Sequence, residues 1–264
     1  MTECSIMVAL SSVLSIIKII DMPYGGSVTV ASMLPIVIAV YRHGSLWGLG
    51  ASLTYATVQI FLGLNTISFF TTWQSILAIV LLDYVIAFGV FALSGIFKRI
   101  EKRQNYAILY GIIFCSLLRY FCHVISGATL WAGLSIPTEA ALIYSVSYNA
   151  TYMLPDTIVL AVVGIYLTSV IDFKSSIPTR VKKREVSKGE LYATLGSGFL
   201  TIVTVIVDVC IIFPHLQNPD SGEFTLAGIK NSNIPLLITV SAIGIIGAVG
   251  LYVYSRLSKS KKSS

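Results

Sequence analysis

The sequence predicts an all-α integral membrane protein that crosses the bilayer eight times. Only 11% of the 264 residues are charged, whereas a soluble domain carries about 25%. Apolar runs of roughly 20 residues, the length that a helix needs to span a bilayer, recur along the chain. They are too long for the strands of a membrane barrel, which are about ten residues each. The expected spans are 4–20, 29–42, 46–64, 70–98, 106–132, 140–171, 190–213 and 234–256.

The distribution of basic residues predicts that both chain termini lie in the cytoplasm. The net charge is +6, and an even number of spans with basic residues in alternate loops satisfies the positive-inside rule. Most lysines and arginines lie at Arg42, 98–103, 174–188 and 256–262. This placement indicates membrane topology and contact with the lipid bilayer, and it does not indicate nucleic-acid binding.

Three parts are expected along the chain. Residues 1–172 contain six spans with short loops and should form one bundle. Residues 173–189 are polar and basic, which indicates a cytoplasmic linker. Residues 190–264 should form a two-helix transmembrane hairpin, with Asp208 as an acid inside an apolar run.

The loop after the first span contains Gly25 and Gly26. A glycine pair indicates either a flexible turn or a backbone segment that approaches a ligand closely. The second possibility would make this loop part of a binding site.

The fourth span carries Asp83 in the middle of an apolar run, with Tyr84 beside it and Trp73 nearer the outside. A buried carboxylate needs a cation or hydrogen-bond donors to stay charged. A structural ion pair would satisfy this need. The functional alternative is a cationic ligand that Asp83 and nearby aromatic rings hold together.

The fifth span carries Arg119, His123, Gly127 and Trp131 at intervals of four, so these residues form one stripe on the helix. Trp131 lies near the outer boundary, and His123 lies about 12 Å deeper at 1.5 Å per residue. An interfacial tryptophan and an interhelical hydrogen bond could explain the two rings separately. Gly127, which opens space between them, favours a shared site.

The sixth span presents polar side chains at the same outer depth: Tyr144, Tyr148, Tyr152 and Asn149. They are either packing and interface residues, or they present hydroxyl and amide groups to a cavity. Asp156 lies deeper on this span and is the expected partner of Arg119 in a structural ion pair.

No motif in the sequence indicates an enzyme or an ATPase. The P-loop, HExxH and GxSxG patterns do not occur. The cysteines lie within or beside apolar segments without a CxxC pair, which indicates packing residues: Cys4, Cys115, Cys122 and Cys210. We therefore expect no catalytic residue, no metal site and no cofactor bound by this chain.

Over residues 1–172 the chain resembles the ThiT/YuaJ family, the thiamine-specific substrate-binding subunits (S components) of energy-coupling factor (ECF) transporters. The motifs that carry the resemblance are GGSVTVASMLPI at 25–36, LLDYVIAFG at 81–89, RYFCHVISGATLW at 119–131 and YSVSYNATYMLPD at 144–156.

The resemblance implies a six-helix bundle with a thiamine pocket at its outer side, capped by the loop after the first helix. It implies that the pocket is lined by Asp83, Tyr84, His123, Gly127, Trp131, Tyr144 and Asn149, with Trp73 as a further aromatic residue. The acid, tyrosine and asparagine suit the aminopyrimidine and hydroxyl groups, and the histidine and tryptophan suit stacking on the thiazolium.

The resemblance also implies protein partners. S components pack their first helix on a shared ECF transmembrane subunit through small residues four positions apart. Ser5 and Ala9 have this spacing, and Ser11 with Ser15 is a second possibility. Two separate ATPase subunits of the complex use ATP.

The chain departs from the family pattern in three places. Some members carry glutamate where this chain has Asp83, and a tryptophan in the first outside loop, where this chain has only Tyr24. The hairpin at 190–264 lies outside the six-helix pattern.

The leading hypothesis is a non-enzymatic subunit that captures thiamine from outside for ATP-driven uptake. The alternatives are an S component for another vitamin and an ion- or proton-coupled carrier that works alone. The carrier would use Asp83, His123, Arg119 and Asp156 as a relay. An intramembrane enzyme with His123 and an aspartate as base and acid has no motif in its favour.

Overall fold

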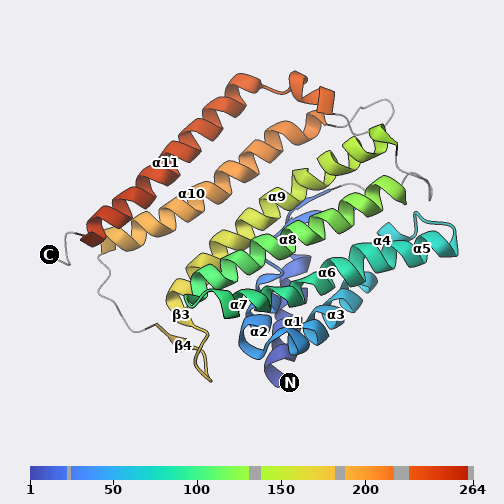
Figure 1. Ribbon diagram of the computed structural model, residues 1–264. Coiled ribbons are helices and arrows are strands. Elements are labelled where there is room, and N and C mark those ends of the chain that lie inside the picture. The colour runs from blue at the N-terminus through green and yellow to red at the C-terminus, as the bar shows by residue number, and fades with distance from the viewer. Residues whose placement is uncertain (23–24, 131–137, 182–187, 217–225, 261–264) are drawn as a thin grey trace. The chain divides into compact units, whose positions relative to one another are not determined.

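The computed structural model describes residues 1–22, 25–130, 138–181, 188–216 and 226–260 (Figure 1). By their internal contacts these residues form two compact units, Met1–Thr179 and Arg180–Ser264. Both units consist mainly of helices. The chain is therefore an all-α membrane protein.

In the first unit a short buried helix, α2 (Leu34–His43), packs against α1 (Thr2–Ile16), α3 (Ser45–Leu62), η2 (Val90–Ile96) and α8 (Gln104–Thr129). The unit also contains the separate helices α4 (Leu64–Ile67) and α9 (Glu139–Val170). A continuous helix contains α5 (Trp73–Ile79), the π-helical η1 (Val80–Ile86), α6 (Ala87–Gly89), the 3-10 helical η2 (Val90–Ile96) and α7 (Phe97–Ile100). Helices α8 and α9 run antiparallel, side by side (Figure 1).

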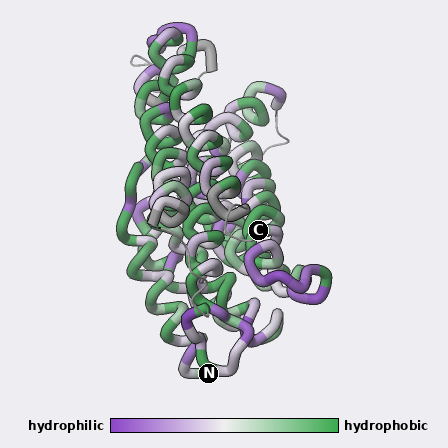
Figure 2. Tube along the Cα trace, turned by 90° about the vertical axis from the view of Figure 1, so that its left-hand side faces the viewer, coloured by the Kyte–Doolittle hydropathy of each residue, from purple (hydrophilic) through white to green (hydrophobic). Residues whose placement is uncertain are grey.

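Each of the eight expected spans contains a helix. Among the described residues, five helices are long and apolar enough to cross a membrane: Trp73–Ile100, Gln104–Thr129, Glu139–Val170, Tyr192–Ile212 and Ile234–Ser255. Helices α1 and α2 are apolar but shorter. Apolar colours dominate the helices in Figure 2, and hydrophilic ones concentrate in the connecting segments.

The first two expected spans were predicted too long. Residues 18–21 form strand β1 (Lys18–Asp21), which pairs antiparallel with β2 (Ser27–Thr29). Both strands are rich in β-branched residues, which favour extended backbone. Gly25 and Gly26 have φ angles of +94° and +92°, which allow the chain to turn between the strands. Helix α2 therefore begins only at Leu34, yet it is buried on all sides from Leu34 to Tyr41.

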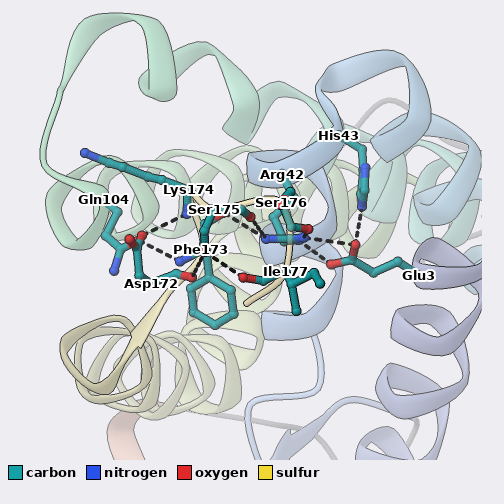
Figure 3. A network of polar contacts seen from close by, with 10 residues as sticks. All are labelled: Glu3, Arg42, His43, Gln104, Asp172, Phe173, Lys174, Ser175, Ser176 and Ile177. Carbon is teal, nitrogen blue, oxygen red and sulfur yellow. Dashed lines mark hydrogen bonds and ion pairs between the residues drawn. The ribbon is translucent and has the colours of Figure 1, made fainter. Parts of the chain in front are cut away.

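The first residues of the expected linker are part of the first unit. Strands β3 (Ile171–Asp172) and β4 (Thr179–Arg180) enclose a turn whose carbonyl groups bind Arg42 (Figure 3). The Arg42 guanidinium donates to the carbonyl oxygens of Phe173, Ser175 and Ser176 at 2.8–3.0 Å and also to Glu3. This cluster is named the Arg42 clasp below.

The clasp fastens the N-terminal end of α1. Glu3 contacts both Arg42 and His43. Burial would raise the pKa of Glu3, but the hydrogen bonds and charges of Arg42 and His43 outweigh it and lower the pKa. Glu3 is therefore held as a carboxylate, and Arg42 has a structural role.

The second unit is a hairpin of α10 (Lys188–Ile212) and α11 (Ile234–Ser260), with 3-10 turns η3 (Phe213–His215) and η4 (Leu226–Asn231) between them. Small residues bring the helices close together: Ser197 Oγ donates to the carbonyl of Ala248 at 2.8 Å. Asp208 accepts a hydrogen bond from Ser241 Oγ at 2.8 Å. The expected hairpin is thus present, and its acid pairs within it.

We predict that Arg42→Met destabilises the first unit by about 2 kcal/mol or more, because three backbone carbonyls and Glu3 lose their donors. Reversible unfolding in mixed detergent measures this change. Arg103→Met is the matched control, since the Arg103 side chain is 68% exposed, and it should change stability by less than about 0.5 kcal/mol. Equal losses in both variants would contradict a structural role for the clasp.

Candidate ligand-binding site

A partly buried carboxylate forms the centre of the site. Asp83 lies in the π-helical segment η1, where it faces α8. His123 Nδ1 lies 2.9 Å from Asp83 Oδ1, and Ser126 Oγ donates to Oδ2 at 2.8 Å. The Asp83 and His123 side chains are only 16% and 13% exposed. Both carboxylate oxygens therefore have a partner on α8.

Arg119 determines which nitrogen of His123 carries the hydrogen. Arg119 lies one turn before His123 on α8, and its Nε donates to His123 Nε2 at 3.3 Å. A guanidinium can only donate, so Nε2 must accept. The Nδ1–H group then donates to Asp83, and the ring is neutral.

Arg119 also forms the predicted pair with Asp156. Its Nη1 lies 3.7 Å from Asp156 Oδ2, and its guanidinium lies over the Phe88 ring, 4.8 Å from the centroid. Asp156 Oδ1 accepts from both the backbone nitrogen and the hydroxyl of Thr29, each at 2.9 Å. The cluster thus extends from the fourth span through α8 and α9 to strand β2.

The charges in this cluster do not balance. Two carboxylates, Asp83 and Asp156, face one guanidinium, Arg119, and a neutral histidine. With both acids ionised, the four side chains carry a net charge of −1. The donors on Asp83 are neutral, so its charge is the one left without a cation among the contacts described.

Asn149 joins α9 to α8. Its Nδ2 donates to the carbonyl oxygens of Ser145, at 2.8 Å, and of His123, at 3.3 Å. Its Oδ1 accepts from Tyr152 at 2.7 Å. Asn149 is 5% exposed. In the described structure its amide therefore clamps the two helices, and a contact with a ligand remains a prediction.

The tyrosines of α9 form a continuous row under strand β2 and its turn. Tyr144 and Tyr148 stack with centroids 5.9 Å apart and planes 3° from parallel, and Tyr148 meets Tyr152 edge-on. Tyr148 donates to the Gly25 carbonyl at 2.7 Å. A Cβ at Gly26 would lie 2.7 Å from the Tyr152 ring. The two glycines thus allow the backbone of this turn to lie close to tyrosine side chains of the protein itself.

The other predicted site residues have different surroundings. Tyr84 is half-buried, and its hydroxyl would lie 2.1 Å from a Cβ at Gly63. Trp73 begins α5 and is 69% exposed. Trp131 and Tyr24 lie outside the described residues.

Gly127 lies where α8 crosses α9 most closely. A Cβ there would come within 2.3 Å of Ser145 Oγ, so the glycine permits helix contact and its pocket role stays a prediction. Within the described part of the chain, no three His, Cys, Asp or Glu side chains gather as metal ligands would.

Sequence reasoning missed several hydroxyl groups of the site. Ser126 follows His123 by three residues and therefore shares its helix face, a spacing that could have revealed it. Thr29 binds Asp156 across 127 residues of sequence, and the Ser32 hydroxyl lies 2.8 Å from the Thr29 hydroxyl, to which it can donate. No local pattern indicates such a distant contact.

We predict that Gly127→Ala destabilises the first unit by about 1–3 kcal/mol, because the added methyl group forces α8 away from Ser145. Gly50→Ala is the control, since a Cβ at Gly50 meets no atom within 4 Å, and alanine favours the helix. Thermal unfolding of the purified protein measures both. A Gly127→Ala protein as stable as the control would show that the helices do not depend on this contact.

Comparison with known proteins places this architecture in a family. The model of the thiamine transporter protein family (Thia_YuaJ) matches residues 1–174. Thiamine transporter ThiT of Bacillus subtilis (strain 168) is 34% identical over 172 residues, which cover 61% of this chain and 85% of that protein.

A solved structure of ThiT from Listeria monocytogenes shares the fold. It superposes with a TM-score of 0.51 at 21% identity and covers 63% of this chain and 91% of its own. The matched region corresponds to the first unit, so the C-terminal hairpin lies outside it. The chain is a multi-pass protein of the cell membrane and belongs to the thiamine transporter protein family.

Proposed function

We propose that this chain is the substrate-binding subunit of an ECF transporter and captures thiamine from outside the cell. Its family and the similarity to ThiT support thiamine as the ligand. The observation that carries the proposal is the carboxylate of Asp83, which is bonded to His123 and Ser126 and contacts no lysine or arginine among the described contacts. The chain itself needs no cofactor, since ATP would be hydrolysed by partner subunits.

Thiamine matches this charge because its thiazolium ring carries one permanent positive charge. Asp83 accepts hydrogen bonds from a histidine and a serine, which leave its charge uncompensated. A cation beside a carboxylate in a poorly solvated site is attracted far more strongly than it would be in water. The row of tyrosines next to the cluster supplies aromatic faces and hydroxyl groups for a flat cation.

The exposed face of α1 supports a helical partner in the membrane. Ser5 and Ala9 are exposed on this helix, as a small-residue contact with the ECF transmembrane subunit requires. Ser11 and Ser15 are buried inside the first unit, where Ser15 accepts from Gln59 at 2.8 Å. We therefore propose the Ser5 and Ala9 face as the contact.

A lone proton-coupled carrier is less well supported. Arg119 lies between His123 and Asp156 in the polar chain, and a guanidinium does not release its proton in proteins. A hydrolase is also less well supported, because Ser126 donates to Asp83, whereas a serine nucleophile must bond to the histidine.

We predict that the purified chain binds thiamine with a change in tryptophan fluorescence, and that Asp83→Asn weakens binding roughly 10- to 100-fold, as loss of a charged partner implies. Titrations with thiamine, its phosphates and riboflavin compare ligand classes. Asp21→Asn is the control, since Asp21 is exposed and pairs with Lys18, and it should bind like the wild type. No response to micromolar thiamine would reject the proposal.

A further inference from the structure

The Arg119–Asp156 pair lies between two parts of the site that have no direct hydrogen bond to each other among those described. On one side, Arg119 donates to His123, the neutral partner of Asp83. On the other side, Asp156 binds Thr29 at the end of strand β2. We propose that Arg119 and Asp156 are positioning residues that fix His123 and strand β2 together. This inference rests on the proposed function, in which Asp83 and His123 contact the ligand.

Arg119 acts on the ring of His123. Its Nε is the donor that occupies Nε2, and this contact leaves the Nδ1–H group for Asp83. Without Arg119, the Nδ1 contact with Asp83 is the only described hydrogen bond that holds the imidazole ring, and the ring can tilt away from the carboxylate. Arg119 thus helps to aim the Nδ1–H donor of α8 at Asp83.

Asp156 acts on strand β2. Its Oδ1 accepts both polar hydrogens that Thr29 offers, and its Oδ2 faces Arg119. Asp156 is buried, so these donors are needed to offset the loss of water. The orientation of Arg119 and the position of Thr29 are therefore set by the same carboxylate.

The two actions form one path of polar contacts. From Asp83 to Thr29, each step joins named side-chain atoms at 3.7 Å or less. A ligand that displaces His123 from Asp83 moves the Nε2 acceptor to which Arg119 donates, and Arg119 shares the Asp156 carboxylate with Thr29. Binding at Asp83 should therefore alter the hydrogen bonding of strand β2, which a simple scaffold pair would not do.

The first test reads the Nδ1–H group of His123 directly. ¹⁵N NMR of protein labelled at histidine resolves three residues, His43, His123 and His215, and His123→Gln assigns the signal. We expect a protonated Nδ1 in the wild type with the chemical shift of a donor bonded to a carboxylate, and a shift toward a weaker hydrogen bond in Arg119→Met, with thiamine affinity about tenfold or more weaker. Arg119→Lys keeps a donor and a charge and should retain the wild-type signal. Arg103→Met, at an exposed site, should change neither quantity.

The second test reads strand β2. Thr29→Val removes the hydroxyl bond to Asp156, and Thr57→Val is the control because its hydroxyl bonds only to its own helix at Leu53. Hydrogen exchange measures the amides of Ser27–Thr29. We expect thiamine to slow exchange there in the wild type, and the slowing to fall several-fold in Thr29→Val and Arg119→Met but not in Thr57→Val.

The outcomes separate this inference from the proposed function. If the wild type binds thiamine and Arg119→Met leaves both the Nδ1–H signal of His123 and the exchange of Ser27–Thr29 unchanged, the positioning role is wrong and the function stands. If the wild type fails to bind thiamine while Arg119→Met still shifts the Nδ1–H signal of His123, the function is wrong and Arg119 still positions the ring.

Discussion

The structure of the first unit depends on the need to satisfy one carboxylate in an apolar helix. Asp83 requires donors at membrane depth, and α8 supplies both of them through His123 and Ser126. The wide π-helical turn at Val80–Ile86 carries this acid, as such turns often do at functional sites. The position of His123 in turn requires Arg119 and then Asp156. The contacts that begin at this one carboxylate thereby connect three helices and a strand.

Much of this arrangement could be predicted from sequence, for physical reasons. Long apolar runs predict spanning helices, because backbone polar groups inside the bilayer must be hydrogen-bonded within the chain. The spacing of four residues correctly predicted that Arg119 and His123 share one helix face. Contacts between segments far apart in the sequence could not be predicted from these local patterns. The bond from Thr29 to Asp156 and the Arg42 clasp join residues more than 120 positions apart. The π-helical turn and strand β1 also escaped prediction, since their residues continue the apolar pattern of a helix.

The chain combines a region that matches the family with an additional hairpin. The family match ends at residue 174, inside the turn whose carbonyls hold Arg42. The clasp lies at the C-terminal end of this region. There the Arg42 guanidinium donates both to Glu3 of α1 and to the turn, and so joins the two. The hairpin forms its own unit, held by close helix contacts and by the bond between Ser241 and Asp208.

We expect the uncompensated charge of Asp83 to select a cationic ligand. The most direct test compares thiamine with an isostere whose five-membered ring is neutral, in the wild type and in Asp83→Asn. We expect the wild type to prefer thiamine and Asp83→Asn to lose roughly tenfold or more of that preference, since the interaction is between these two charges. The same ratio of affinities in both proteins would show that the charge of Asp83 does not select the ligand.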